Sequence, residues 1–398
     1  MISVEAALAA VLDLAGRPGQ ETVPLRAAAG RVLAAPVVAR RDQPPFAASA
    51  MDGYAIRAED HRPGAQLDVT ATAAAGRGAG AVVAPGTAVR IFTGAPVPPG
   101  AGRVVLQEDV SRDGDRITLG PRLEAADHIR PAGTDFRAGD RLDPPRRLSP
   151  RDLALIAAMG AESVTVARRP VVAFIATGDE LVMPGETPRP DQIVSSNPFA
   201  LAAMAEAEGA EARILPIARD RPESLRFALG LAAGADLVVT IGGASVGDHD
   251  LVAKVAGEAG LAVAFHRVAM RPGKPLMAGR LAGQAMLGLP GNPVSSIVCG
   301  HLFMLPLLRA MQGLPKAPAP TFRAALAEAV AANGPRAHYM RARIEPDAPA
   351  AGGLPAVRPF AAQDSSLLRL LSEADALIVR PPGDPARAAG HVADCIAL

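Results

Sequence analysis

Glycines and acidic residues follow several short apolar runs in this chain. The glycines suggest that these segments bind phosphates. The stretch LVVTIGGASVGDHDLV contains Gly242, Gly243, Ser245, Gly247, Asp248 and Asp250. Such glycines let the backbone approach a ligand closely and present N–H groups to an anion. The carboxylates oppose an anion, because like charges about 4 Å apart repel by roughly 4 kcal/mol at an effective dielectric constant near 20. We therefore predict a Mg²⁺ ion, which typically binds one or two carboxylates together with phosphate oxygens.

Four more segments with such residues follow apolar runs. They are TGDEL with Asp179 and Glu180, ARD with Asp220, RPGKP with Arg271, Gly273 and Lys274, and LPGNPVSS with Asn292 and Ser295. Asn292 can cap a helix, and Ser295 falls in its first turn, where free N–H groups accept an anion. A helix cap without a ligand explains the same residues equally well. Some of the acids could also cap helices, and Asp248 is the best candidate to do only that.

The lysines of this chain are few, namely Lys254, Lys274 and Lys316. Lys254 lies in a helical pattern and Lys316 in a linker, so we interpret both as solvated surface. Lys274 stands in a Pro-Gly-Lys-Pro turn beside Arg271, and a compact ammonium suits an oxyanion that changes during a reaction. An exposed turn lysine is the alternative.

Three further candidates come from the N-terminal third of the chain. Asp52 lies in QPPFAASAMDGYA, Thr93 in FTGAPVP and Asp135 in RPAGTDFRAGD. Turn chemistry explains all three as well as ligand binding does.

The segments of the C-terminal half alternate between strand and helix patterns. Strands are predicted at 171–176, 212–218, 236–243, 261–270 and 285–291, and helical patterns lie between most of them and after the last. This alternation predicts a doubly wound, mostly parallel α/β sheet over residues 168–314. Ligands of such sheets bind beyond the carboxyl ends of the strands, so the segments above should meet on one rim.

The remaining chain predicts three other regions. Short alternating runs between glycines and prolines indicate a β-rich module, and a helix followed by a strand is expected at 148–166. After the linker PKAPAP the tail alternates again, which predicts a small all-β domain. The predicted domains are 1–40 with 141–167 as a connecting domain, 41–140 as the β-rich module, 168–314 as the α/β domain, and 318–398 as the C-terminal β domain.

Composition limits the classes of function. Lys plus Arg (41) nearly balance Asp plus Glu (40), so no basic field indicates nucleic acid or an anionic membrane. The N-terminal stretch MISVEAALAAVLDLAG carries acids and no basic region, so we predict an amphipathic helix there and no signal peptide. Residues 281–308 are apolar, but prolines and a glycine interrupt them, which favours a buried strand, a turn and a core helix over a membrane span. Cys299 and Cys395 match no metal-ligand spacing, and a soluble, cytoplasmic protein is expected.

The ordered set of motifs resembles the molybdopterin molybdenumtransferase family, which includes the C-terminal domain of gephyrin. The motifs are SAMDGYA, RIFTGAPVPPGA, RPAGTD, TGDEL, TIGGASVGDHD, RPGKP and LPGNPVSS, and they extend over nearly the whole chain. The resemblance implies a Mg²⁺-dependent transferase that inserts molybdate into adenylyl-molybdopterin and releases AMP. It also implies an elongated homodimer whose site lies between subunits, and transient contact with the adenylyltransferase of the pathway.

The resemblance also implies roles for individual residues. Asp220 and Asp250 resemble acids near the metal and AMP, and Lys274 and Ser295 resemble ligands of molybdate or phosphate, with Arg271 beside them. Asp52, Thr93, Asp135 and Glu180 resemble active-site positions, and Arg341 and Ser365 resemble oxyanion contacts. The glycines of the loops (Gly242, Gly243, Gly247 and Gly273), Ser245 and Asn292 are implied in binding the substrate.

The chain departs from the family pattern at several positions. Ala47 and Ala48 stand where the family commonly has Asp-Asn, Ser195 replaces an Asp, and Arg271 stands where a lysine is common. Two alternatives therefore stay open: an adenylyltransferase of the same pathway, and a catalytically impaired paralogue or scaffold of the gephyrin type.

Overall fold

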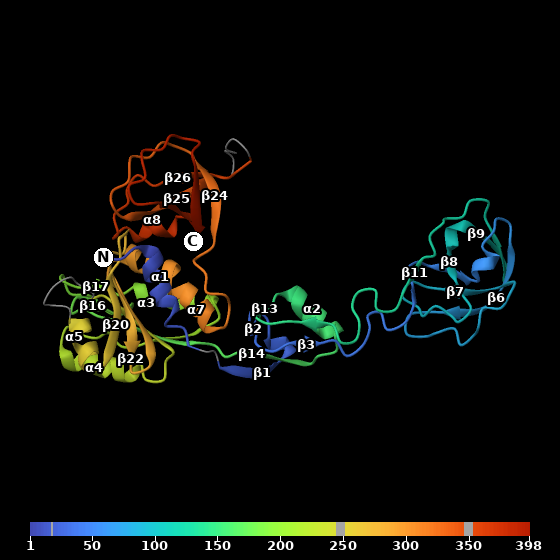
Figure 1. The fold of residues 1–398 in the computed structure, drawn as a ribbon, viewed down its shortest axis with the longest axis horizontal. Helices are drawn as coiled ribbons and strands as arrows, with labels where there is room; N and C mark the ends of the chain where they lie inside the picture. Colours follow the sequence, from blue (N-terminus) through green and yellow to red (C-terminus); the bar gives the residue numbers. More distant parts are fainter. Residues whose placement is uncertain (17–18, 244–250, 346–352) are drawn as a thin grey trace. The chain divides into compact units, whose positions relative to one another are not determined.

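The computed structural model describes residues 1–16, 19–243, 251–345 and 353–398. The chain folds into two compact units (Figure 1). One combines Met1–Glu21 with Ala167–Leu398, and the other comprises Thr22–Val166.

A six-stranded sheet lies at the centre of the first unit. Its strands, in spatial order, are β18 (Glu211–Ile214), β15 (Val171–Ala176), β19 (Leu237–Ile241), β23 (Gln284–Leu289), β22 (Pro275–Leu281) and β20 (Leu261–Arg267). The first four run parallel, whereas β22 and β20 are antiparallel to their neighbours. Every residue of β15 and β19 is buried, as expected for strands covered on both faces. The predicted mostly parallel sheet is confirmed.

Two strand predictions need correction. The single strand predicted at 261–270 is two strands in different sheets, β20 and β21 (Met270–Arg271), and β22 was not predicted. The sequence PLMAGRL of β22 begins with Pro275, the last residue of the RPGKP turn, and it pairs antiparallel with both neighbours. The regular alternation of strand and helix therefore breaks between β20 and β23, since the four strands β20 to β23 follow one another without a helix between them.

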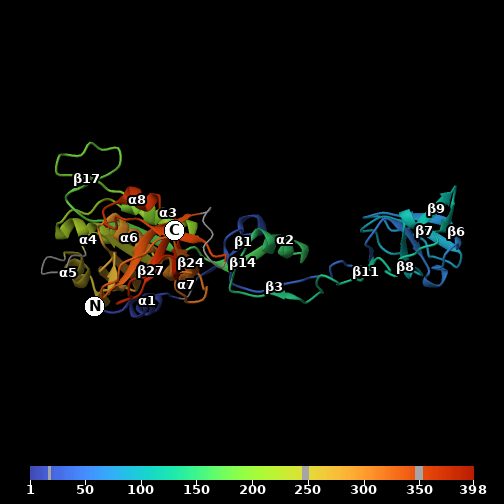
Figure 2. The same ribbon diagram turned by 90° about the horizontal axis from the view of Figure 1, so that it is seen from above.

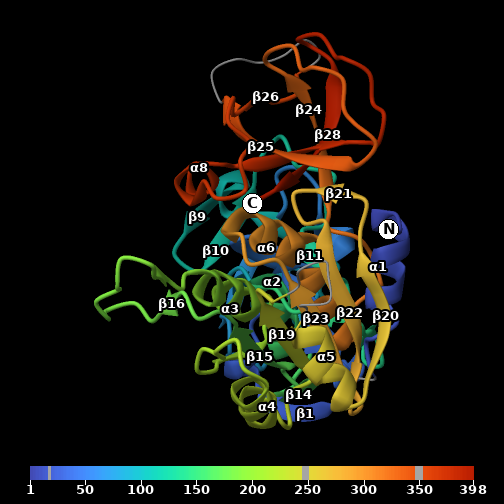
Figure 3. The same ribbon diagram turned by 90° about the vertical axis from the view of Figure 1, so that its left-hand side faces the viewer.

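Helices cover both faces of this sheet (Figures 1 and 3). One hydrophobic cluster joins a sheet face to α1 (Val4–Leu12), α3 (Asn197–Ala207), α6 (Pro293–Cys299), a π-helical turn (Gly300–Met304) and α7 (Leu305–Met311). The other face packs on α4 (Pro222–Leu231) and α5 (Leu251–Glu258). The span Pro293–Met311 is long and apolar enough to cross a membrane, with a mean hydropathy of 1.5, but 83% of it is buried inside the protein. It is the predicted core helix.

A small β-barrel completes the first unit. Its strands are β24 (Thr321–Leu326), β25 (Ala337–Glu345), β26 (Ala356–Pro359), β27 (Ala376–Arg380) and β28 (Val392–Ala397), with the short helix α8 (Leu368–Ser372) before β27. Pairing of β25 with β27 closes the barrel, and β21 adds to β25. Tyr339, Leu377 and Ile396 of the barrel belong to the same hydrophobic cluster as α6 and α7. The barrel therefore packs against the α/β domain through a continuous core.

The second unit contains two main sheets. One joins β1 (Gln20–Pro24), β14 (Ser163–Ala167), β2 (Val32–Leu33) and β13 (Arg146–Arg147), and it is accompanied by α2 (Pro150–Ala158). The other joins β8 (Arg103–Leu106), β5 (Gly53–Ile56), β7 (Thr87–Ile91), β6 (Gln66–Ala73), β10 (Arg116–Leu119) and β9 (Val110–Asp113). Two short pairs, β3 (Val37–Val38) with β12 (Arg141–Leu142) and β4 (Ala48–Ser49) with β11 (Ile129–Arg130), add to these.

A cavity at the carboxyl edge of the α/β sheet

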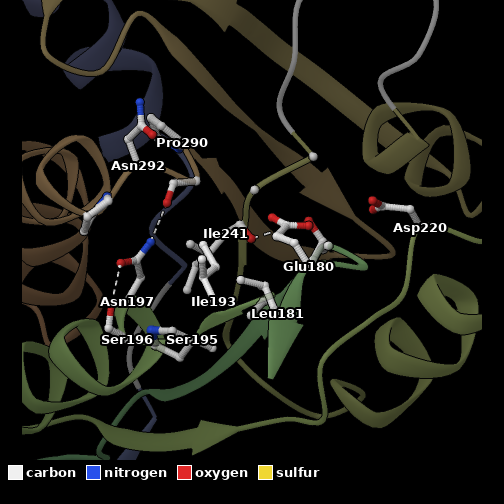
Figure 4. A pocket seen from close by; sticks show the side chains of 18 of the residues that line it. Glu180, Leu181, Ile193, Ser195, Ser196, Asn197, Asp220, Ile241, Pro290 and Asn292 are labelled. Atoms are coloured by element: carbon white, nitrogen blue, oxygen red, sulfur yellow. Dashed lines mark hydrogen bonds between the residues drawn. The ribbon is translucent and has the colours of Figure 1, made fainter. Parts of the chain in front are cut away.

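A cavity of about 1070 Å³ opens at the carboxyl ends of the parallel strands (Figure 4). Its lining includes residues from the segments that follow β15, β18, β19 and β23. It lies where β15 pairs with β18 on one side and with β19 on the other, which is the topological switch point of the sheet. The predicted convergence of the five segments on one rim is confirmed, since the lining includes Glu180, Asp220, Gly242 with Gly243, Pro275 and Asn292.

Two carboxylates, those of Glu180 and Asp220, line this cavity (Figure 4). The loop of Glu180 follows β15, and that of Asp220 follows β18. The two loops are joined, because the Asp220 N–H donates to Oδ1 of Asp179 at 3.2 Å and the Gly178 N–H donates to the Ala218 carbonyl at 3.1 Å. The Glu180 side chain folds over Gly178, where a Cβ would lie 2.4 Å from Oε2. A larger residue at this position would displace the carboxylate.

The glycines after β19 form a second wall of the cavity. Gly242 has a φ of +93° and Gly243 a φ of +64°, and a Cβ on them would lie 2.8 Å from the Thr177 carbonyl oxygen and 2.4 Å from Cγ2 of Val252, respectively. Both the backbone conformation and the close neighbours therefore require glycine. Four predicted residues of the same loop, Ser245, Gly247, Asp248 and Asp250, lie outside the described residues.

Asn292 precedes α6, but it does not cap this helix as predicted. Its side chain makes no capping hydrogen bond and instead donates to Oγ of Ser365 at 3.0 Å. The carbonyl of Ser365 accepts from the Val294 N–H at 3.1 Å. A loop of the barrel thus accepts a hydrogen bond from one N–H in the first turn of α6. Ser295 in the same turn is only 5% exposed.

Three further polar residues of the cavity were not predicted as contacts. Ser195, Ser196 and Asn197 line it, and the Asn197 amide donates to the Gly291 carbonyl at 2.7 Å. Serine and asparagine before the proline of a helical pattern are the signal that could have found them. Next to them, β16 (Leu181–Val182) pairs with β17 (Ile193–Val194). Figures 2 and 3 both show the segment between these strands projecting from the domain.

The loop of Arg271, Gly273 and Lys274 lies beside this cavity. Pro275, the next residue, lines it, and the Lys274 carbonyl accepts from the Val268 N–H at 3.1 Å. Within the described part of the chain, no carboxylate forms an ion pair with the side chain of Arg271 or Lys274. His338 pairs with Arg271 across β25 and β21, and burial, together with Arg271 and other arginines, lowers its pKa to about 4.

Lys254 is exposed on α5, as its interpretation as solvated helix surface expects, and it also lines the cavity, which was not predicted.

Arg341 occupies a different place from the expected oxyanion contact. The residue is 1% exposed, and its guanidinium donates to the carbonyls of Ala362, Asp364 and Leu367 at 3.3, 2.9 and 3.1 Å. It shapes the barrel loop that carries Ser365 and that places Ser366 against the cavity.

The candidates of the second unit are Asp52, Thr93 and Asp135. Oδ1 of Asp52 accepts from both the N–H and the hydroxyl of Thr93, each at 2.7 Å. These hydrogen bonds, the backbone one first, lower the pKa of Asp52, and Arg90 contributes. Asp135 is exposed, and its N–H donates to the Gln43 carbonyl at 2.9 Å.

The carboxylates of the cavity fit Mg²⁺ held jointly with a substrate. Across the residues that the structure describes, no three His, Cys, Asp or Glu side chains gather as a metal cluster. Glu180 and Asp220 both line the cavity, and Mg²⁺ typically takes one or two carboxylates, with phosphate oxygens and waters completing its site.

The fold and cavity define a multidomain α/β protein with a ligand site at the switch point of its sheet. Residues 2–160 match the family described as the MoeA N-terminal region (domain I and II), residues 173–310 a probable molybdopterin binding domain, and residues 323–398 the MoeA C-terminal region (domain IV). The chain belongs to the molybdopterin molybdenumtransferase family, as its motifs predicted.

Relatives and solved structures agree with this assignment. The chain is 39% identical to a molybdopterin molybdenumtransferase of Nostoc sp., over 76% of this chain and 72% of the relative. It is 38% identical to molybdopterin molybdenumtransferase 2 of Mycobacterium tuberculosis, over 81% of this chain and 83% of the relative. The crystal structure of the molybdopterin biosynthesis moeA protein from Pyrococcus horikoshii OT3 is 28% identical, with a TM-score of 0.85 and 100% of both chains covered.

Proposed function

We propose that this chain is a molybdopterin molybdenumtransferase, which inserts molybdate into adenylyl-molybdopterin and releases AMP. The observation that carries the proposal is the cavity at the switch point, where two carboxylates and a glycine wall face the same space. Its volume of about 1070 Å³ is at the upper end of the range for small-molecule sites, which suits a substrate with a nucleotide and a pterin.

The residues of the cavity divide into two sets by chemistry. The backbone at Gly242 and Gly243 offers close approach to a phosphate, and Lys254 supplies a positive charge on the same cavity. Glu180 and Asp220, together with Asp250 of the neighbouring loop, would hold Mg²⁺. When bound, this ion would neutralise the phosphate oxygens of the substrate and stabilise the charge on AMP as it leaves.

Lys274, Arg271 and Ser295 are the proposed contacts of molybdate, with Ser365 near the same helix turn. A lysine ammonium can follow an oxyanion that changes its bonding, whereas the buried Arg341 holds the barrel loop in place. Asp52, Thr93 and Asp135 remain proposed active-site residues of the second unit. Exchange of Lys274 for alanine should raise the molybdate concentration for half-maximal rate without unfolding the chain.

The proposal includes a homodimer in the cytoplasm, with adenylyl-molybdopterin, molybdate and the adenylyltransferase of the pathway as partners. Sedimentation analysis tests the dimer directly. An adenylyltransferase is the competing enzyme, and it would release pyrophosphate from molybdopterin and ATP unaided. The matches to the N-terminal and C-terminal MoeA regions favour the transferase, since an α/β domain alone would suffice for the competing activity.

The decisive experiment supplies purified protein with adenylyl-molybdopterin, Mg²⁺ and molybdate, and follows AMP by chromatography. We expect AMP release that requires both ions and falls by 100-fold or more in Asp220→Asn. Asp13→Asn is the matched control, because Asp13 is exposed, pairs with Lys316 and does not line the cavity. A folded wild-type protein that releases no AMP would refute the proposal.

A further inference from the structure

Arg219 is anchored between the two loops that carry the carboxylates of the cavity. One terminal nitrogen of its guanidinium donates to the carbonyls of Leu181, Asp179 and Gly178, at 2.9, 3.1 and 3.5 Å. Its own N–H donates to Oγ of Ser224 at 2.9 Å, in the first turn of α4. Through its side chain and its backbone N–H, Arg219 therefore connects the loop after β15 to the start of α4.

The loop after β15 depends on donors from outside itself. The Glu180 carbonyl accepts from the Ile193 N–H at 2.8 Å, so all four carbonyls from Gly178 to Leu181 have donors, and Arg219 supplies three of them. Gly178 has a φ of +148°, and the residues before β16 form no regular helix or strand. Without Arg219, the carbonyls of Gly178 and Leu181 would lose these donors, and Asp179 would keep only the longer bond of 3.4 Å from the Gln192 amide.

The charge of Arg219 is directed at backbone oxygens and not at the acids. Within the ranges that the structure describes, no carboxylate forms an ion pair with its guanidinium. Asp179 instead accepts from the Asp220 N–H at 3.2 Å, which leaves the carboxylates of Glu180 and Asp220 facing the cavity. A positive side chain beside three acids thus supports their arrangement without occupying the oxygens that a cation would need.

We propose that Arg219 is a positioning residue, which fixes Glu180 relative to Asp220 so that the two carboxylates hold Mg²⁺ against the phosphate of the substrate. The inference rests on the proposed function, since it assigns Mg²⁺ to these two acids. Residues that orient metal ligands through hydrogen bonds typically change metal affinity or activity by about 10- to 100-fold when replaced.

The test compares Arg219→Met and Arg219→Lys with the control Arg213→Met. Arg213 lies on β18, before the same loop, and among the described residues its ion pair is with the exposed Glu211 alone. Calorimetry measures AMP affinity over a series of Mg²⁺ concentrations, and hydrogen exchange of residues 177–182 is measured without ligand. Arg219→Met should raise the Mg²⁺ concentration for half-maximal effect by about 10-fold or more and should speed exchange in that segment. Arg219→Lys should show smaller changes in the Mg²⁺ concentration and in the exchange rate than Arg219→Met. Arg213→Met should change neither quantity.

The possible outcomes separate a failure of the positioning role from a failure of the proposed function. If Arg219→Met keeps the Mg²⁺ midpoint and the exchange of wild type, the positioning role is refuted. A loss of AMP sites per chain with an unchanged midpoint in the remaining sites would mean a folding role only, which also overturns the inference. If the wild type binds no AMP, the proposed function fails, whereas the exchange measurement still tests whether Arg219 holds the loop.

Discussion

Replacement of Gly273 by alanine tests how the loop of Lys274 is held. Gly273 has a φ of +106°, and a Cβ there would lie 2.5 Å from Sγ of Cys299 and 3.0 Å from Cε of Met270. The methionine methyl ends a flexible side chain and can move. Cys299 is 0% exposed inside α6, so its sulfur has little room to yield.

The expected cost has a backbone part and a steric part. A residue with a Cβ at positive φ costs about 1–2 kcal/mol, and forced overlap in a packed core costs about 1–3 kcal/mol. Gly273→Ala should therefore destabilise the α/β domain by about 2–5 kcal/mol, or displace the loop to avoid this cost. Cys299→Ala removes the obstructing sulfur, so in that background only the backbone part of about 1–2 kcal/mol should remain.

A double-mutant cycle with both residues measures this coupling. The readouts are the free energy of unfolding, from hydrogen exchange at β23 in urea, and the molybdate concentration for half-maximal AMP release. Gly283→Ala is the matched control, because Gly283 has a φ of +88° and a Cβ there would have no neighbour within 4 Å. We expect a coupling of about 1–3 kcal/mol between Gly273 and Cys299. Additive effects of Gly273→Ala and Cys299→Ala, or equal costs for Gly273→Ala and Gly283→Ala, would refute the reasoning.

Three further changes test other parts of the site and fold. Lys254→Ala should weaken AMP binding, measured by calorimetry, about 5-fold, which corresponds to roughly 1 kcal/mol for one exposed ionic contact. Lys316→Ala is the control. Equal AMP affinities of Lys254→Ala and the wild type would exclude the contact. Ser365→Ala removes the acceptor of the Asn292 amide and should raise the substrate concentration for half-maximal rate by roughly 5-fold, as for a hydrogen bond near 1 kcal/mol; unchanged kinetics would contradict its role. Burial lowers the pKa of His301 to about 4, so its imidazole stays neutral in the fold while the unfolded chain binds a proton below about 6.5. Stability should therefore fall as the pH drops from about 6.5 towards 4, and His301→Asn should flatten this part of a denaturation series; an equal slope in both proteins would be contrary evidence.

Much of the α/β domain follows from local pattern. The apolar run at 171–176 is β15 to the residue, because a strand buried on both faces shows as continuous hydrophobic sequence. The meeting of these segments at one rim was also predictable, because residues that follow parallel strands meet at one edge of the sheet. Alternation could not reveal β22, because its pairing is antiparallel and its first residue is a proline.

The omissions and errors within the site came from features that spacing does not encode. Lys254 has ordinary helical spacing, which does not indicate that it lines the cavity. Asn292 has the sequence of a helix cap, but a barrel loop distant in sequence supplies Ser365 as its partner. Arg341 is enclosed by carbonyls of its own barrel, and Arg219 showed no motif beyond the ARD that contains it. Each of these depends on tertiary contacts that one sequence does not display.

The central claim is that one cavity at the carboxyl edge of the α/β sheet binds the nucleotide and the molybdate. Crystals grown with AMP, Mg²⁺ and molybdate test it most directly, with anomalous scattering recorded at the molybdenum edge. We expect the phosphate of AMP against Gly242 and Gly243, and a molybdenum peak beside Lys274. Nucleotide or molybdenum bound elsewhere, with this cavity empty, would contradict it.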